Sequence, residues 1–167
     1  MRKLLFLILT LTLCQAASAQ MAKFQALYIL NFARNTSWPA EDASKPLVIT
    51  VVGDNALYSE MRNVVANKQV GGRSISVGES ATAGGLPKSD IIFLGESMSR
   101  QVGSLVAAQR GNKVMIVSGS KGHCAQGAGI SFVADGGKLG FEIHEGNIEK
   151  NGLKVTAKLL QLGKQVY

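Results

Sequence analysis

Cysteine is scarce in this sequence: only Cys14 and Cys124 occur among the 167 residues. Cys14 closes an apolar stretch, Leu4 to Leu13, that follows the basic pair Arg2-Lys3. A positive start followed by a short apolar run is the pattern of a secretory signal peptide. Removal of this peptide would leave Cys124 without a partner in the chain, which excludes an internal disulfide.

A long apolar run is also missing, because a membrane-spanning helix needs about 20 apolar residues and this run is shorter. A small-x-small site ending at Ala19 predicts cleavage there, so residues 1–19 are expected to be the signal peptide and residues 20–167 one exported domain. A lipoprotein anchored at Cys14 is the competing interpretation. It is disfavoured because Leu13 stands where lipoprotein processing requires a small residue.

Acidic residues are few as well. The chain has 11 Asp and Glu against 18 Lys and Arg, a formal charge of +7 that becomes +5 without Arg2 and Lys3. The basic residues are scattered, without the clusters or interleaved aromatic residues that bind nucleic acid. We therefore expect no nucleic-acid partner. The charge indicates solvated surface, with attraction to an anionic membrane or an acidic partner as the alternative.

Repeats, linkers and low-complexity tracts are absent, and apolar runs alternate with helical patterns. Residues 21–38 have apolar side chains at helical spacing up to Pro39, which predicts a well-buried helix. Further helices are expected after Asp54, a plausible N-cap, and over residues 97–111. The expected strands are residues 45–53, 73–78, 90–95 and 112–119. This alternation is typical of a mostly parallel sheet with helices on both faces.

The C-terminal part has a different pattern. Residues 130–132 and 139–143 alternate apolar and other side chains around Asp135-Gly136-Gly137, a strong hairpin signal. A final helix is expected from about Asn147 or Gly152 onward. The predicted fold is therefore a single three-layer α/β domain, in which a mostly parallel sheet ends in an antiparallel hairpin and a final helix.

Motifs for catalysis and cofactor binding are missing. No strand is followed by glycines at dinucleotide-binding spacing, and Lys121-Gly122 precedes a strand rather than the helix that would receive a phosphate. No serine stands in a G-x-S-x-G turn. His123, Cys124 and His144 are the only soft metal-ligand candidates, and they lack the paired spacing of a metal site. We expect no catalytic residue, no cofactor and no metal.

Cys124 beside His123 raises the possibility of an activated thiol. Side chains of neighbouring residues tend to diverge, and an export compartment is oxidising, so a reactive dyad is disfavoured. A small half-buried residue in a loop is the favoured interpretation of Cys124. An intermolecular disulfide and a nucleophilic thiol remain as alternatives.

The order of these segments resembles the YfiR family of exported bacterial proteins over essentially all of the chain after the signal peptide. The most specific likeness lies in "NFARNTSWP" and in the run from "GISF" to "FEIHEGNIEKNGLKVTAKLL". The resemblance implies a non-enzymatic periplasmic protein that binds and inhibits the periplasmic part of an inner-membrane diguanylate cyclase. It thereby implies control of cyclic di-GMP and biofilm formation, sequestration by an outer-membrane lipoprotein, and the possibility of a homodimer.

Two features depart from the family pattern. Relatives with cysteine pairs can form an internal disulfide, whereas Cys124 stands alone in the exported domain. The family's first helix stays apolar up to its Trp-Pro, whereas residues 35–37 here are polar, so the contacts of this segment are expected to differ.

Candidate partner contacts are Phe32 and Trp38 at the end of the first helix, although core packing is the favoured interpretation of both aromatic side chains. Glu142 is the third candidate, because it alternates with apolar neighbours on the hairpin and is expected to face solvent or a partner.

The alternative hypothesis is a periplasmic small-molecule sensor or an accessory protein of a histidine kinase. Its ligand would bind at the carboxyl ends of the parallel strands, near Asp54, Glu96 and Ser118.

Overall fold

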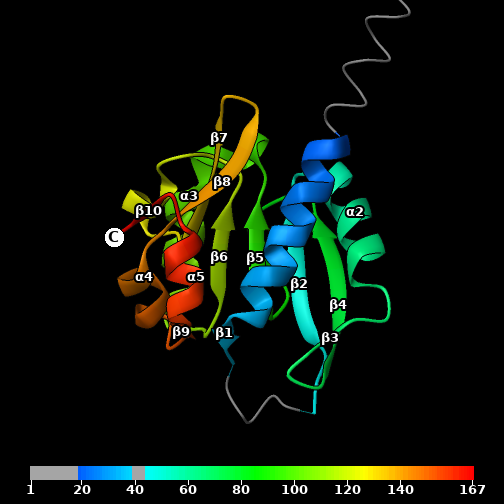
Figure 1. The fold of residues 1–167 in the computed structure, drawn as a ribbon. Helices are drawn as coiled ribbons and strands as arrows, with labels where there is room; N and C mark the ends of the chain where they lie inside the picture. The colour runs from blue at the N-terminus through cyan, green and yellow to red at the C-terminus, as the bar shows by residue number, and fades with distance from the viewer. Residues whose placement is uncertain (1–18, 39–43) are drawn as a thin grey trace, which may run out of the picture.

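The computed structural model describes residues 19–38 and 44–167. The expected signal peptide up to residue 18, which includes Cys14, and Pro39 lie outside these residues. The described chain is built around an eight-stranded sheet with the strand order β10-β8-β7-β6-β5-β2-β4-β3, and a separate two-stranded sheet joins β1 to β9 (Figure 1).

The strands are β1 (Thr36–Ser37), β2 (Leu47–Val52), β3 (Gln69–Val70), β4 (Arg73–Ser80), β5 (Ile91–Leu94), β6 (Met115–Ser118), β7 (Ile130–Asp135), β8 (Lys138–Ile143), β9 (Lys154–Val155) and β10 (Gln165–Val166). The helices are an N-terminal helix of residues 19–34, α2 (Asn55–Val65), α3 (Val102–Ala108), α4 (Glu145–Lys150) and α5 (Ala157–Leu162). Two 3-10 helices complete the chain, η2 (Glu96–Gln101) and η3 (His123–Gln126).

Most neighbouring strands of the large sheet are parallel. β4, β2, β5, β6 and β7 run in one direction, whereas β8 is antiparallel to β7 and closes the predicted hairpin. β10 then adds parallel to β8, and β3 pairs antiparallel with β4 at the opposite edge. The predicted fold, a mostly parallel sheet with helices, a C-terminal hairpin and a final helix, is confirmed.

Helices cover the two faces of the sheet unequally. The N-terminal helix crosses the front face between α2 and α5, and α3 lies behind the sheet (Figure 1). The front core is large and contains Phe32, Phe93, Phe132 and Phe141, whereas α3 contributes Val102 and Leu105 to a smaller core on the back face. Each core buries apolar strand residues, which is why the central strands read as continuous apolar runs.

Asp54 caps α2 as predicted, since its carboxylate accepts a hydrogen bond of 2.9 Å from the Leu57 N–H. Leu57, Met61 and Val65 lie one turn apart and are the buried residues of this helix. α2 therefore packs on the sheet through a single stripe.

Three helix boundaries differ from the prediction. The N-terminal helix ends at residue 34, because the Thr36 hydroxyl bonds to the Phe32 carbonyl at 2.8 Å and the chain then forms β1 against β9. The predicted helix over 97–111 begins as the 3-10 helix η2, and its α-helical part ends at Ala108. The final helix is α5, and β9 separates it from the shorter helix α4.

Candidate functional site

Phe32, a predicted partner contact, is buried in the front core with 0% of its surface exposed. Its ring centroid lies 4.9 Å from that of Phe141 and 5.8 Å from that of Phe132. Tyr28 completes this group of rings at 6.0 Å from Phe32. Core packing, the favoured interpretation of Phe32, is confirmed, and no surface of this side chain is available to a partner in this fold.

Trp38 is half-buried and packs against the front core. Its indole N–H donates a hydrogen bond of 2.8 Å to the Ala33 carbonyl. This bond folds the Trp38 side chain back onto the N-terminal helix, so the ring also has a core-packing role. Part of the ring is accessible, and its contact with a partner stays a prediction.

Glu142 is buried with 3% of its surface exposed, so the expectation that it faces solvent is wrong. Two neighbours cover it. β10 pairs with β8 beside Glu142, and the loop before η3 folds over the carboxylate, which accepts a hydrogen bond of 3.0 Å from the Gly122 N–H. A contact between Glu142 and a partner stays untested, and the observed contacts of this residue hold the loop in place.

The glycine-rich loop around His123 is a compact structural connection. Gly122 and Gly127 bracket η3 with φ values of 81° and 105°, a left-handed conformation that favours glycine. The buried Ser118 hydroxyl and His123 Nδ1 are 2.7 Å apart. Burial lowers the pKa of His123 from its usual value, because the charged imidazolium is poorly solvated there. His123 is thus a neutral hydrogen-bonding partner of Ser118.

Asn147 fastens the same loop from α4. Its side-chain amide donates to the carbonyls of Cys124 and Ala128, at 2.8 and 3.0 Å. The Cys124 carbonyl lies in η3 and the Ala128 carbonyl follows this helix. The glycines of the loop have no side chains that could hydrogen-bond to these carbonyls. Asn147 follows the hairpin in the sequence, and it holds in place the loop that precedes the hairpin.

Cys124 is a free thiol and is almost completely buried. Burial, the largest effect, and the charge of Glu142 together raise its pKa to about 11. The Ser131 hydroxyl lies close enough to oppose this rise, although it forms no hydrogen bond of good geometry. At neutral pH this thiol is therefore almost entirely protonated. Cys124 is a fully buried residue of η3 rather than the half-buried loop residue favoured from the sequence, and it lacks the properties of a nucleophile.

Asp54 and Glu96 share a hollow at the carboxyl ends of β2 and β5, as predicted for a ligand cleft. The hollow has a volume of about 530 Å³ and is also lined by Gly53, Ser97 and Met98. Ser118 is not part of it, because this residue is fully buried against His123. The structure brings two of the three predicted cleft residues together.

The crevice beneath this hollow is closed. The strand order reverses between β2 and β5, the point where ligands bind in many open α/β sheets. Here the Gly95 N–H bonds to the Val52 carbonyl at 2.8 Å, and the Ser97 hydroxyl bonds to the Gly53 carbonyl at 3.0 Å. A Cβ atom on Gly95 would lie only 2.8 Å from the Gly53 oxygen. The strand ends leave no space between them for a ligand, and only the shallow hollow above supports the cleft hypothesis.

Residues 19–38 and 44–167 contain neither a cluster of metal-binding side chains nor a helix suited to span a membrane. No three His, Cys, Asp or Glu side chains in these segments lie together as a metal site would require. None of the helices in these segments combines the length and the apolar character needed to cross a bilayer.

The N-terminal helix exposes an apolar surface that the sequence pattern did not reveal. Phe24 and Leu27, expected on the buried face, are 46% and 45% exposed. We call these two residues the helix patch. A hollow of about 620 Å³ adjoins Phe24 and is lined by Tyr28 and Leu139. Large exposed apolar side chains grouped beside a hollow are typical of protein-binding surfaces.

These features define the class of protein: an α/β protein in which His123 and Cys124 are buried in structural roles, and whose exposed helix patch is suited to binding another protein. Residues 22–164 match the YfiR/HmsC-like family. The chain therefore belongs to the YfiR/HmsC-like family, as its sequence resemblance predicted. No curated protein matches the chain.

Proposed function

We propose that this protein is a non-enzymatic periplasmic regulator that binds the periplasmic part of an inner-membrane diguanylate cyclase and keeps the cyclase inactive. Membership of the YfiR/HmsC-like family over residues 22–164 is the observation that carries the proposal. The buried state of Cys124 and His123 agrees with a role that does not depend on catalysis.

Inhibition would work as a population shift. A regulator that binds the inactive conformation of the cyclase more tightly than the active one lowers the active fraction. A shift from 99% active to 99% inactive requires a preference of about 10⁴-fold. An outer-membrane lipoprotein that sequesters the regulator would remove this bias and restore cyclase activity.

The helix patch is the surface that we assign to the cyclase. Phe24 and Leu27 lie one turn apart on the N-terminal helix, and their exposed apolar area would be removed from water in a complex. Lys138 lines the hollow beside Phe24 and provides a polar rim. Trp38 stays a candidate contact at the other end of the same segment, because it is only half-buried.

The test uses residues 20–167 as bait on inner membranes of the native host. We expect a diguanylate cyclase with a periplasmic segment to be recovered, and the double change Phe24→Ala and Leu27→Ala to reduce its recovery at least tenfold. Lys23→Ala is the matched control, because it changes an exposed side chain of the same helix outside the helix patch, and it should leave recovery within about twofold. Recovery of no cyclase, together with unchanged cyclic di-GMP after deletion of the gene, would refute the proposal.

A further inference from the structure

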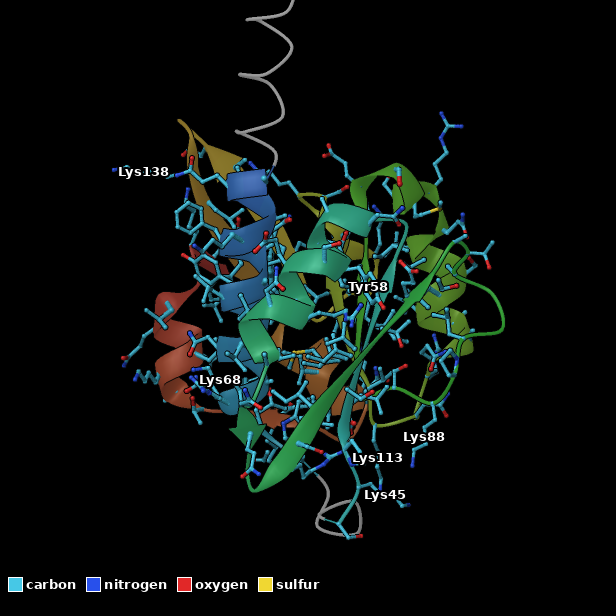
Figure 2. The ribbon with its side chains drawn as sticks, turned by 90° about the vertical axis from the view of Figure 1, so that its right-hand side faces the viewer. Lys45, Tyr58, Lys68, Lys88, Lys113 and Lys138 are labelled. Carbon is cyan, nitrogen blue, oxygen red and sulfur yellow. The ribbon has the colours of Figure 1, made fainter. Side chains whose placement is uncertain are left out.

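The outer edge of β4 is open along most of its length. β2 pairs with one edge of β4 from Ile75 to Ser80, whereas β3 pairs with the other edge only at Arg73 and Ser74. Within the described part of the chain, no strand lies beyond residues 75–80. Figure 2 shows β4 crossing the front of the view, with α2 and Tyr58 beside it.

The open edge presents backbone groups in hydrogen-bonding positions. The Ser80 carbonyl accepts a bond of 2.9 Å from the Gly53 N–H, so Ser80 directs its backbone groups toward β2. Because these directions alternate along a strand, Val77 and Glu79 direct their N–H and C=O groups outward, beyond the end of β3. Such a row of unpaired groups is a site at which another extended chain can add.

A groove runs beside this edge. It has a volume of about 630 Å³ and lies between β4 and the C-terminal part of α2. Val65, Ile75 and Val77 supply its apolar lining, and the two strand residues are half-buried. An added strand would place every second side chain over this apolar lining, since side chains alternate between the two faces of a sheet.

Positive charge lies at one end of the groove. Arg62 and Lys68 are exposed, and neither forms an ion pair with any residue in 19–38 or 44–167. The Arg62 guanidinium lies over the Tyr58 ring, 5.8 Å from its centroid, which helps to hold the charge at the groove. Glu79 stands at the other end of β4 and is exposed. This polarity favours an acidic group beside Arg62 and Lys68.

We propose that the groove between α2 and the open edge of β4 binds an extended segment of another protein as an added β-strand. The segment is about six residues long, matching the roughly 20 Å of open edge. It has apolar side chains at alternate positions and an acidic end that contacts Arg62 and Lys68. The groove is formed by other elements than the helix patch, so this site is independent of the proposed contact with the cyclase and allows a second partner.

The test uses fluorescein-labelled octapeptides in which valine alternates with threonine. One peptide carries two aspartates at one end, its counterpart carries two lysines there, and a third is the acidic peptide with N-methylated valines, which cannot donate backbone hydrogen bonds. Residues 20–167 are titrated with each peptide by fluorescence anisotropy, and amide hydrogen exchange is followed by NMR. We expect only the first peptide to bind, and to slow exchange at Val77 and Glu79 without a comparable change at Ser76 and Gly78, which already face β2.

Charge reversal tests the acidic end. The double change Arg62→Glu and Lys68→Glu should weaken binding about tenfold or more, a difference of about 1.4 kcal/mol, because two attractive surface contacts become repulsive. Lys154→Glu with Lys158→Glu is the matched control, because both lysines are exposed near α5, away from the groove, and the change in net charge is the same.

Three results would overturn the proposal. The first is no binding of the acidic peptide at millimolar concentration. The second is equal binding of the acidic and N-methylated peptides. The third is protection of Val77 and Glu79 that increases with protein concentration when no peptide is present, since a second copy of the chain would then occupy the edge.

Discussion

Replacement of Phe32 by alanine tests whether this aromatic residue belongs to the core or to a binding surface. The ring is fully buried and lies within 6.0 Å of Tyr28, Phe132 and Phe141, measured between centroids. Removal of a buried phenylalanine ring costs about 3–5 kcal/mol, and lost aromatic contacts favour the upper part of this range. We therefore expect Phe32→Ala to lower the free energy of unfolding by about 4 kcal/mol.

Urea unfolding followed by circular dichroism measures this loss. With a slope of about 2 kcal/mol per molar urea, the midpoint should fall by about 2 M while the slope is unchanged. If Phe32→Ala does not fold, Phe32→Leu gives a smaller and measurable loss of about 1–1.5 kcal/mol.

Phe24→Ala is the matched control, because it removes the same side chain from the exposed face of the same helix. It should change stability by less than about 1 kcal/mol and should weaken partner binding instead. A loss below about 1 kcal/mol for Phe32→Ala would contradict the assignment of Phe32 to the core.

Three further predictions follow from buried polar groups. Alkylation of Cys124 by iodoacetamide at pH 8 should be at least about 100-fold slower than alkylation of an exposed cysteine, because burial raises its pKa to about 11, and a rate within tenfold would contradict this. Asp90→Ala should lower the free energy of unfolding, measured by heat or urea, by about 3 kcal/mol, because it leaves the buried Arg73 guanidinium without the carboxylate that lies 2.8 Å away. A loss under about 1 kcal/mol would show that the ion pair is unimportant for stability. The contribution of His123 to stability should be fully present above pH 6.5 and fall as the pH drops below that value, because burial lowers its pKa in the folded state only. His123→Gln should remove this fall of the urea midpoint with decreasing pH. A midpoint that still falls to the same extent would assign the pH dependence to other groups.

The fold was predictable where several residues share one pattern. The apolar runs that became β2, β5 and β6 report burial on both faces, and Asp135-Gly136-Gly137 reports the turn of the hairpin directly. β1, β3, β9 and β10 have two residues each, too few for any periodicity, so they were not predicted. Their pairing depends on which segments the rest of the fold brings together.

The candidate site was less predictable, because burial depends on tertiary contacts. Alternation placed Glu142 on the opposite face from its apolar neighbours but could not show that β10 and the glycine-rich loop cover it. The N-terminal helix is apolar around most of its circumference, so helical spacing could not distinguish exposed Phe24 from buried Phe32. The free edge of β4 likewise depends on where β3 stops.

The central claim is that this protein inhibits a diguanylate cyclase through its periplasmic part, and its most direct test is the rate of cyclic di-GMP synthesis in proteoliposomes. The host's full-length cyclase would be reconstituted and residues 20–167 titrated on the periplasmic side. The account predicts a saturable fall in the rate, which Phe24→Ala with Leu27→Ala shifts to at least tenfold higher concentration and Lys23→Ala does not. A rate that stays constant at saturating regulator would contradict the account.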